Sequence, residues 1–430
     1  MSKIILGAGC LLALAASGAG ANWYADKKLA DYYEHAEISK ALEELEVRYS
    51  NIQLGMMKGS ADWEITLILD PCKPKDVIVL QGKDQIQKKW NGYNIESSFK
   101  VKSGSEKIKA ALKGEQHIQT HINWMGKTKS TVHLPRIDTQ NQGVHMRLEP
   151  SLISIYSESA AQDESEVSKV VFELPALTVT EGQIQILAQN IKLDSNQGLG
   201  EKEIRDGHTH FSIGAFQRID KQFSGKFKNF EMLMNTEVKD SRVTLDGSFK
   251  IGELTLPSTP LIKDMTINLA LSNIKTQDLN SLSAVWDKSQ NSCESSELMQ
   301  ADVSQAFLNL VNEGMEFKSE NQLSMSDGTA SAKLEGKLMP GHQGSLSAFA
   351  KMLPNLLSFK ANLAFDKNIY RTVMNSYAQA STGKMLTEPD IEQAFSSLEA
   401  SGQAKRDGDQ LKMLLEYQFG QKQFLDPDKN

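Results

Sequence analysis

The sequence predicts a mainly β protein with some α structure: an N-terminal transmembrane helix that continues into a helix, followed by an elongated, mostly antiparallel β domain with a few helices. Residues 4–21 carry no charged side chain, which is typical of a membrane-inserted segment. Many later segments alternate apolar and polar residues with the period of two that marks a half-buried strand. Glycine and Asp-Gly turns separate those segments, as expected for hairpins.

The first 24 residues are expected to form a membrane anchor. Its apolar and interfacial residues are Ile4, Leu6, Leu11, Leu12, Leu14, Trp23 and Tyr24. A helix over residues 4–21 is about 27 Å long, just enough for a thin hydrocarbon core. The alternative is a signal peptide cleaved after Ala21, because Ala19-Gly20-Ala21 fits a small-x-small cleavage site. The anchor predicts a single-pass bacterial inner-membrane protein with most of its chain in the periplasm, and cleavage predicts a soluble periplasmic protein.

Small residues recur every four positions within this anchor. They are Gly9, Ala13, Ser17 and Ala21, and in a helix they share one face. Such a face lets two transmembrane helices approach closely, so it predicts a homodimer. Chance alignment in a segment rich in Ala and Gly is the alternative.

Composition narrows the classes of partner. The formal net charge is −7 and no basic patch is interleaved with aromatics, which argues against nucleic acid. The membrane bilayer, other envelope proteins and a lipid ligand remain as expected partners. Three cysteines are too few for a disulfide scaffold. With Cys10 in the anchor, Cys72 and Cys293 are candidates for one disulfide or remain as thiols.

The chain after the anchor is expected to have four parts. Residues 25–48 form a helical stem, because Leu29, Tyr32, Leu42 and Leu45 recur at helical spacing. Residues 49–156 form a first β region, residues 157–168 a polar linker, and residues 169–430 a second β region with helical insertions.

Strand patterns follow in order. In the first β region they predict strands at 63–69, 95–101, 115–123 and 128–134. In the second they predict strands at 170–174, 177–180, 184–193, 209–213, 225–234, 241–256, 265–271, 315–325, 330–338, 357–365, 402–404 and 411–419. Hairpins are expected at Ser326-Asp327-Gly328 and Asp407-Gly408-Asp409. Helices are expected at 279–286, 298–312, 369–380 and 391–398.

The search for catalytic or cofactor motifs finds none that holds. His208 and His210 form a His-x-His, but in a strand both rings belong to one solvated face. His117 and His121 are four residues apart, yet Ile118 replaces the glutamate that a zinc protease needs, and the alternation predicts a strand. We therefore expect no enzyme activity, no metal and no cofactor.

Several segments together resemble a known family. They are the anchor running into Gly20-Ala21-Asn22-Trp23-Tyr24-Ala25, the strand pair at 49–69, the hairpin at Ser326-Asp327-Gly328 and the closing Lys405-Arg406-Asp407-Gly408-Asp409 hairpin. This order and length resemble the YdgA-like (YihF-like) bacterial envelope proteins, a family of unknown function. The resemblance implies an inner-membrane anchor with an outward-facing β domain, and it supplies no catalytic residues. The ending at 424–427 departs from the family, which leaves the final strand open.

Three functions remain open. The first is a non-enzymatic envelope scaffold or interaction protein that uses the sheet or its edges. The second is binding or transfer of a lipid or similar amphiphile by the β domain. The third is a hydrolase without a recognisable motif. The first two functions differ in the role that they give to residues 226–234. Phe227, Met232, Leu233 and Met234 are ordinary core in a scaffold, or an adaptable ligand lining in a lipid-binding protein.

Overall fold

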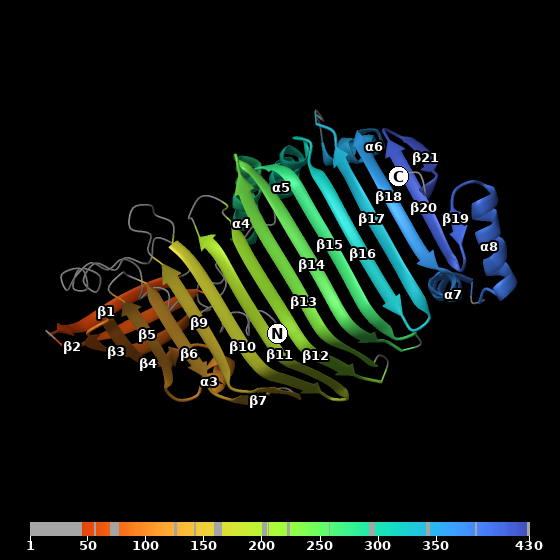
Figure 1. The fold of residues 1–430 in the computed structure, drawn as a ribbon. Helices are drawn as coiled ribbons and strands as arrows, with labels where there is room; N and C mark the ends of the chain where they lie inside the picture. Colours follow the sequence, from red (N-terminus) through yellow and green to blue (C-terminus); the bar gives the residue numbers. More distant parts are fainter. Residues whose placement is uncertain are drawn as a thin grey trace. The chain divides into compact units, whose positions relative to one another are not determined.

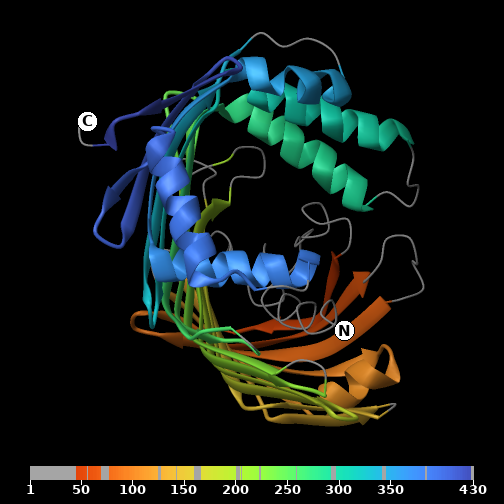
Figure 2. The same cartoon turned by 90° about the vertical axis from the view of Figure 1, so that its right-hand side faces the viewer.

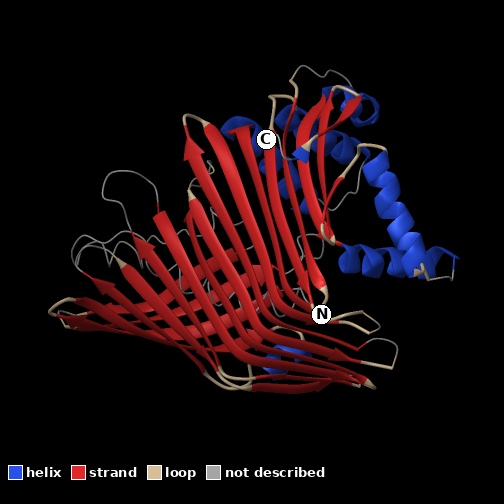
Figure 3. Cartoon of the chain, turned by 45° about the vertical axis from the view of Figure 1, so that its right-hand side comes forward, coloured by secondary structure: helices blue, strands red, loops and turns tan. Residues whose placement is uncertain are grey.

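The computed structural model describes residues 45–55, 57–68, 77–123, 127–141, 143–158, 166–199, 204, 206–221, 224–257, 259–291, 297–340, 345–382 and 385–427. The chain divides into two compact units, residues 1–211 with 288–295 and residues 212–287 with 296–430. The described parts of both units are mainly antiparallel strands, with helices at a few connections (Figures 1 and 3). The expected β-rich fold with a few helices is therefore confirmed.

The first unit is an antiparallel sheet. Its strands are β1 (Leu45–Leu54), β2 (Lys58–Ile68), β3 (Val77–Lys89), β4 (Gly92–Ser103), β5 (Gln116–Asn123), β6 (Thr128–Leu134), β7 (Ile137–Asn141), β8 (Val144–Leu148), β9 (Ser151–Glu158), β10 (Glu166–Glu181) and β11 (Ile184–Leu199). Each of β1 to β5 pairs with the next strand, and the order then continues β6, β9, β10, β11. The β7–β8 hairpin pairs with the second half of β10.

One face of this sheet is a buried core. Trp63, Leu80, Phe99, Val132 and Ile153 belong to one cluster and are at most 5 % exposed. The short helix α3 (Glu106–Ala111) and the residue after it add Ile108 and Leu112 to the same cluster. The strands alternate because every second side chain enters this core.

The second unit contains further antiparallel strands, reached through β12 (Gly207–Ile219), and the part of the sheet that they form is called the second sheet. Its strands are β13 (Ser224–Lys239), β14 (Arg242–Thr255), β15 (Ile262–Lys275), β16 (Glu316–Met325), β17 (Gly328–Leu338), β18 (Leu357–Asp366), β19 (Lys405–Asp407), β20 (Gln410–Gln418) and β21 (Gln421–Leu425). The order is β13, β14, β15, β16, β17, β18, β20, and both β19 and β21 pair with β20.

Helices of the second unit lie on one side of its sheet (Figure 2). They are α4 (Thr276–Asn291), α5 (Glu297–Val311), α6 (Leu346–Leu356), α7 (Lys367–Thr382) and α8 (Glu388–Ala400). Ile391 and Phe395 of α8 form a buried cluster with Leu411, against which Phe365 and Tyr370 pack. The side of the sheet that these helices meet is therefore its apolar face.

The predicted hairpins are confirmed. Ser326 and Asp327 form the turn between β16 and β17, where Met325 pairs with Gly328. Gly408 has a φ of 63° in the turn between β19 and β20, a left-handed conformation that glycine adopts without strain.

Some boundaries differ from the sequence prediction. Residues 45–48, the end of the expected stem helix, lie in β1. Val47 and Tyr49, two residues apart in this strand, both pack against the core of the first unit. The expected linker at 157–168 is partly strand, since β9 ends at Glu158 and β10 begins at Glu166. Along the chain, the division between the two compact units falls between Phe211 and Ser212, inside β12.

The strands expected at 170–174 and 177–180 are one strand, β10. Pro175 does not end the strand. The pairing of β10 with β11 omits Pro175 but keeps its register from Leu174 to Ala176. On the other side, β10 pairs with β9 up to Glu173 and with β8 from Leu177 onward. The prediction also missed β3, the β7–β8 hairpin, β9, β21 and the helices α3 and α6.

Candidate functional site

Among the residues that the structure describes, apolar side chains on one face of the second sheet are exposed over β13, β14 and β15. The term apolar strip is used here for Phe230, Met232, Met234, Leu245, Gly247, Phe249, Ile251, Met265, Ile267, Leu269 and Leu271. Met234 is 51 % exposed, Phe249 38 %, Ile267 39 % and Leu269 44 %. Contiguous exposed apolar surface of this kind marks an interaction or ligand site more often than chance exposure does.

Strand register assembles the strip from residues far apart in the chain. Met232 pairs with Phe249, which pairs with Ile267. Two residues along each strand, Met234 pairs with Gly247 and Gly247 with Leu269. Because side chains two residues apart share a face, both rows lie on the same face of the sheet.

Helices bound the strip on two sides. At one end, Val243 and Ile274 are paired and almost fully buried, and β15 contacts α5. Across the sheet, α7 contacts β17 and β18. Ala330 and Ala332 on β17 leave room for that approach, because they project little from the sheet. The helices therefore cover the margins of the apolar face and leave its middle open.

Gly247 makes a notch in the strip. A Cβ placed on this residue would meet nothing nearer than the Leu269 carbonyl oxygen at 3.8 Å. The flanking side chains, Met234 and Leu269, are both exposed. The notch is therefore open space between two apolar side chains.

The chemistry of the strip is that of hydrocarbon contact. Between the rows of Leu245 and Ile251, the apolar-face positions of β13 to β17 carry no charged residue. The polar side chains in these rows are Thr236, Ser319 and Asn321. The Ser319 hydroxyl donates to the Asn268 carbonyl at 2.9 Å and accepts from Asn321 Nδ2 at 3.0 Å. The hydrogen bonds of Ser319 therefore involve a backbone carbonyl and an amide side chain.

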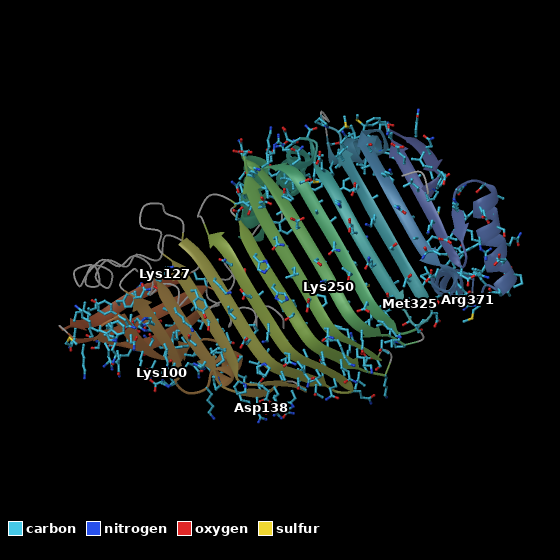
Figure 4. All side chains as sticks on the ribbon, in the orientation of Figure 1. Lys100, Lys127, Asp138, Lys250, Met325 and Arg371 are labelled. Carbon is cyan, nitrogen blue, oxygen red and sulfur yellow. The ribbon has the colours of Figure 1, made fainter. Side chains whose placement is uncertain are left out.

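The opposite face of the second sheet is polar. Lys250 lies on it and is labelled on β14 in Figure 4. Lys318 Nζ lies 3.2 Å from Glu335 Oε1 and 3.5 Å from a Glu320 oxygen. The hydrogen bond to Glu335, with the charges of both carboxylates, raises the pKa of Lys318. This face is a solvated ladder of cross-strand charge pairs.

The sequence-predicted site residues fall in two groups. The anchor residues from Ile4 to Tyr24, the small-residue face from Gly9 to Ala21, and both Cys72 and Cys293 lie outside the described residues. In the described part of the chain, no helix is long and apolar enough to cross a membrane.

The histidines lie on described strands. His117 and His121 are in β5, as expected, and His208 and His210 are in β12. His210 Nε2 is buried and has no hydrogen-bond partner among the described residues. Within those residues, no group of three or more His, Cys, Asp or Glu side chains is placed to hold a metal ion.

The first unit has a concave region of about 530 Å³ where strand ends meet prolines. Pro135, Pro150 and Pro175 line it, with His117 and His133 beside them. Gln116 Oε1 and Ser151 Oγ at its edge are buried without a partner in the described part of the chain. Gln116 and Ser151 lie one position along their strands from the row that contains His117 and His133. Their side chains therefore lie on the other face of the sheet.

Fold and site together define a β-sheet protein with exposed apolar side chains on one face of its second unit. The chain belongs to a bacterial family described as "Bacterial protein of unknown function (DUF945)", which matches residues 1–424. No curated protein and no solved structure matches the chain. Of the four residues that the sequence offered as a ligand lining, Met232 and Met234 lie in the apolar strip, and the Phe227 ring lies 5.8 Å from that of Phe230 at its end. Leu233 lies between the two methionines and therefore faces the other side of the sheet. Strand pairing adds Gly247, Phe249 and Leu269 to the strip.

Proposed function

We propose that this protein is a non-enzymatic bacterial envelope protein whose second unit binds the hydrocarbon part of a lipid or similar amphiphile on the apolar strip. The observation that carries the proposal is the 38–51 % exposure of Met234, Phe249, Ile267 and Leu269. Full burial of such side chains is worth about 1.5–3 kcal/mol each, so a ligand that covers them gains binding free energy. Methionine adds a flexible, polarizable contact surface.

The scaffold alternative has less support in the described edge strands. β21 spans only Gln421–Leu425 and carries Lys422, and β1 is irregular between Ser50 and Gln53. Short, charged or bulged edges hinder the addition of another strand. The sheet face is therefore the better candidate for a binding surface than the sheet edges.

Localisation follows from the sequence. The uncharged segment at 4–21 supports an inner-membrane protein with its β units in the periplasm, or a soluble periplasmic protein if the segment is cleaved. The order of turns and strands supports a relationship to the YdgA-like envelope proteins within the wider family. An amphiphile ligand suits either location, because membrane lipids are the amphiphiles at hand there.

A photo-cross-linking experiment tests the proposal in cells that make the full chain. The photoreactive residue p-benzoylphenylalanine replaces Phe249 in one variant and Lys250 in the other. These neighbours on β14 face opposite sides of the sheet. Irradiation and mass spectrometry should show a lipid-sized adduct at position 249 and none at position 250.

Gly247→Phe sharpens the test. A Cβ at this position meets nothing nearer than 3.8 Å, and the phenyl ring would occupy the face on which the hydrocarbon chain is proposed to lie. It should reduce the adduct at position 249 at least tenfold, whereas Gly247→Ala should leave it unchanged. A protein adduct at position 249, or no adduct, would refute lipid binding and leave the scaffold function.

A further inference from the structure

Two polar side chains interrupt the apolar face directly beside the apolar strip. They are Ser319 and Asn321 on β16, and they are called the polar island here. Because residues two apart in a strand share a face, both side chains lie on the face of the strip. Six apolar residues surround the island on that face, two from β15, two from β17 and two from β16 itself: Ile267, Leu269, Ala332, Leu334, Phe317 and Leu323.

The island does not use its full hydrogen-bonding capacity. Asn321 Nδ2 donates one hydrogen to Ser319 Oγ at 3.0 Å. The single hydroxyl hydrogen of Ser319 has the Asn268 carbonyl oxygen at 2.9 Å, nearer than Asn321 Oδ1 at 3.3 Å. An asparagine amide has two N–H donors and an oxygen that can accept twice. Among the described residues, the second N–H of Asn321 therefore has no acceptor.

A ligand on the apolar strip would cover this amide. Ser319 and Asn321 are half-buried, so the fold does not seal them from solvent. Ile267 and Leu269, which pair with them on the neighbouring strand, are 39 % and 44 % exposed. Paired strands lie only about 4.8 Å apart. A hydrocarbon chain that covers Ile267 and Leu269 therefore also removes water from the Asn321 amide.

This loss of water sets a condition on the ligand. An amide N–H that loses water without gaining a partner costs binding free energy, and an acceptor placed beside it removes that cost. The apolar-face positions of the sheet around the island carry no charged side chain that could pair with a charged group. The partner that fits is therefore neutral, and the carbonyl oxygen of an ester or amide has the required chemistry.

Resting on the proposed function, we infer that the bound amphiphile is an acyl lipid whose ester or amide carbonyl accepts a hydrogen bond from Asn321. Its hydrocarbon chain extends from this linkage over Ile267 and Leu269 to Phe249 and Gly247. Asn321 is then a specificity-determining residue, which selects a carbonyl-linked chain over an ether-linked chain of the same length.

Three matched probes test the linkage. They are a monoacylglycerol (ester), an N-acylserinol (amide) and a 1-O-alkylglycerol (ether), which carry the same diazirine-bearing chain and no net charge. Each is added to the purified full chain and irradiated, and labelled peptides are quantified by mass spectrometry. The ester and amide probes should label β13, β14 and β15 about fivefold more than the ether probe, the ratio expected for one net hydrogen bond.

Substitutions of Asn321 assign the preference to this residue. Asn321→Leu removes the amide and keeps nearly the same size, so it should raise labelling by the ether probe and lower labelling by the ester probe. Asn321→Asp keeps an oxygen acceptor but has no N–H to donate, and it should also lose the preference for the ester. The control is Asn362→Leu, the same change at an exposed residue that pairs with Lys333 on the polar face. It should keep the wild-type preference.

The outcomes separate this inference from the proposed function. Equal labelling of the strip by the three probes, or a preference that survives both Asn321 variants, would overturn the linkage inference while hydrocarbon binding stands. Failure of every probe to label the strip would overturn both. Unequal labelling by the ester and amide probes, with the ether probe weakest, would support the inference and show which linkage the site prefers.

Discussion

Gly82 shows how one missing side chain decides the core of the first unit. A Cβ at this position would lie 2.3 Å from Trp63 Cζ2 and 2.8 Å from the Ser98 carbonyl oxygen. The Trp63 ring occupies that space and donates its Nε1 hydrogen to the buried Asp84 Oδ1 at 2.7 Å. Glycine is therefore needed here so that the ring can lie against the strand.

Gly82→Ala should lower the free energy of unfolding by about 1–3 kcal/mol, because overpacking forces the ring or backbone to move. Gly247→Ala is the matched control, since it adds the same methyl group to a strand with open space above it. Its effect should stay within about 0.5 kcal/mol or be stabilising. Urea denaturation of the two variants and the wild type measures both. Equal costs would contradict the assigned role of Gly82.

The sequence alone could not separate these two glycines. Each interrupts an alternating strand, which suggests a weak strand or a turn. Gly82 and Asp84 broke the pattern of β3 enough that the strand was missed. Their purpose becomes visible only when β2 and β3 are paired and Trp63 is seen opposite Gly82.

At the level of elements, α8 is held to its neighbours by a carboxylate. Glu392 accepts hydrogen bonds from Arg406 on β19 and from Lys367 on α7, the latter at 2.8 Å. These bonds, that of Arg406 being the stronger influence, lower the pKa of Glu392 to about 2. Since its ordinary value is 4.5, the carboxylate contributes stability above pH 4.5 and loses it as the pH falls towards 2.

Glu392→Gln should therefore lower the melting temperature at pH 7 and lose most of that effect near pH 2.5. The substitution removes the negative charge of Glu392, whereas glutamine keeps nearly the same size and one hydrogen-bond acceptor. Thermal unfolding at a series of pH values gives the difference directly. A difference that stays constant from pH 7 to pH 2.5 would mean that the ion pairs do not stabilise α8.

Hairpins and long alternating strands could be predicted because their signals are local. The turn at Ser326 and Asp327 and the strand β6 needed no tertiary information. The sequence did not indicate that one strand changes its pairing partner along its length. Pro175 suggested a strand end, yet it lies where β10 changes partner from β9 to β8. The residues at 45–48 fit helical spacing and strand alternation equally, and the first core decides for strand.

At the level of the whole molecule, the two units follow one pattern with different results. Both sheets have an apolar face and a polar face. In the first unit the apolar face is buried, as at Leu80 and Phe99, whereas in the second the middle of that face is open at Phe249 and Leu269. A period of two tells which residues share a face and not whether the face is covered. The candidate site could therefore not be predicted from the sequence, although two of its methionines were noted.

This contrast predicts where the stability of the chain resides. Leu80 is 2 % exposed and Leu269 is 44 % exposed. Leu80→Ala should cost about 2–5 kcal/mol, because it removes buried methyl groups and leaves a cavity. Leu269→Ala should cost well under about 1 kcal/mol, because most of the lost contact is with solvent. Urea denaturation of the ligand-free protein at low concentration compares the two. If Leu269→Ala proved as costly as Leu80→Ala, the apolar strip would be covered in solution and would act as core. A small cost would mean that the apolar residues of the strip are retained for a ligand and not for folding.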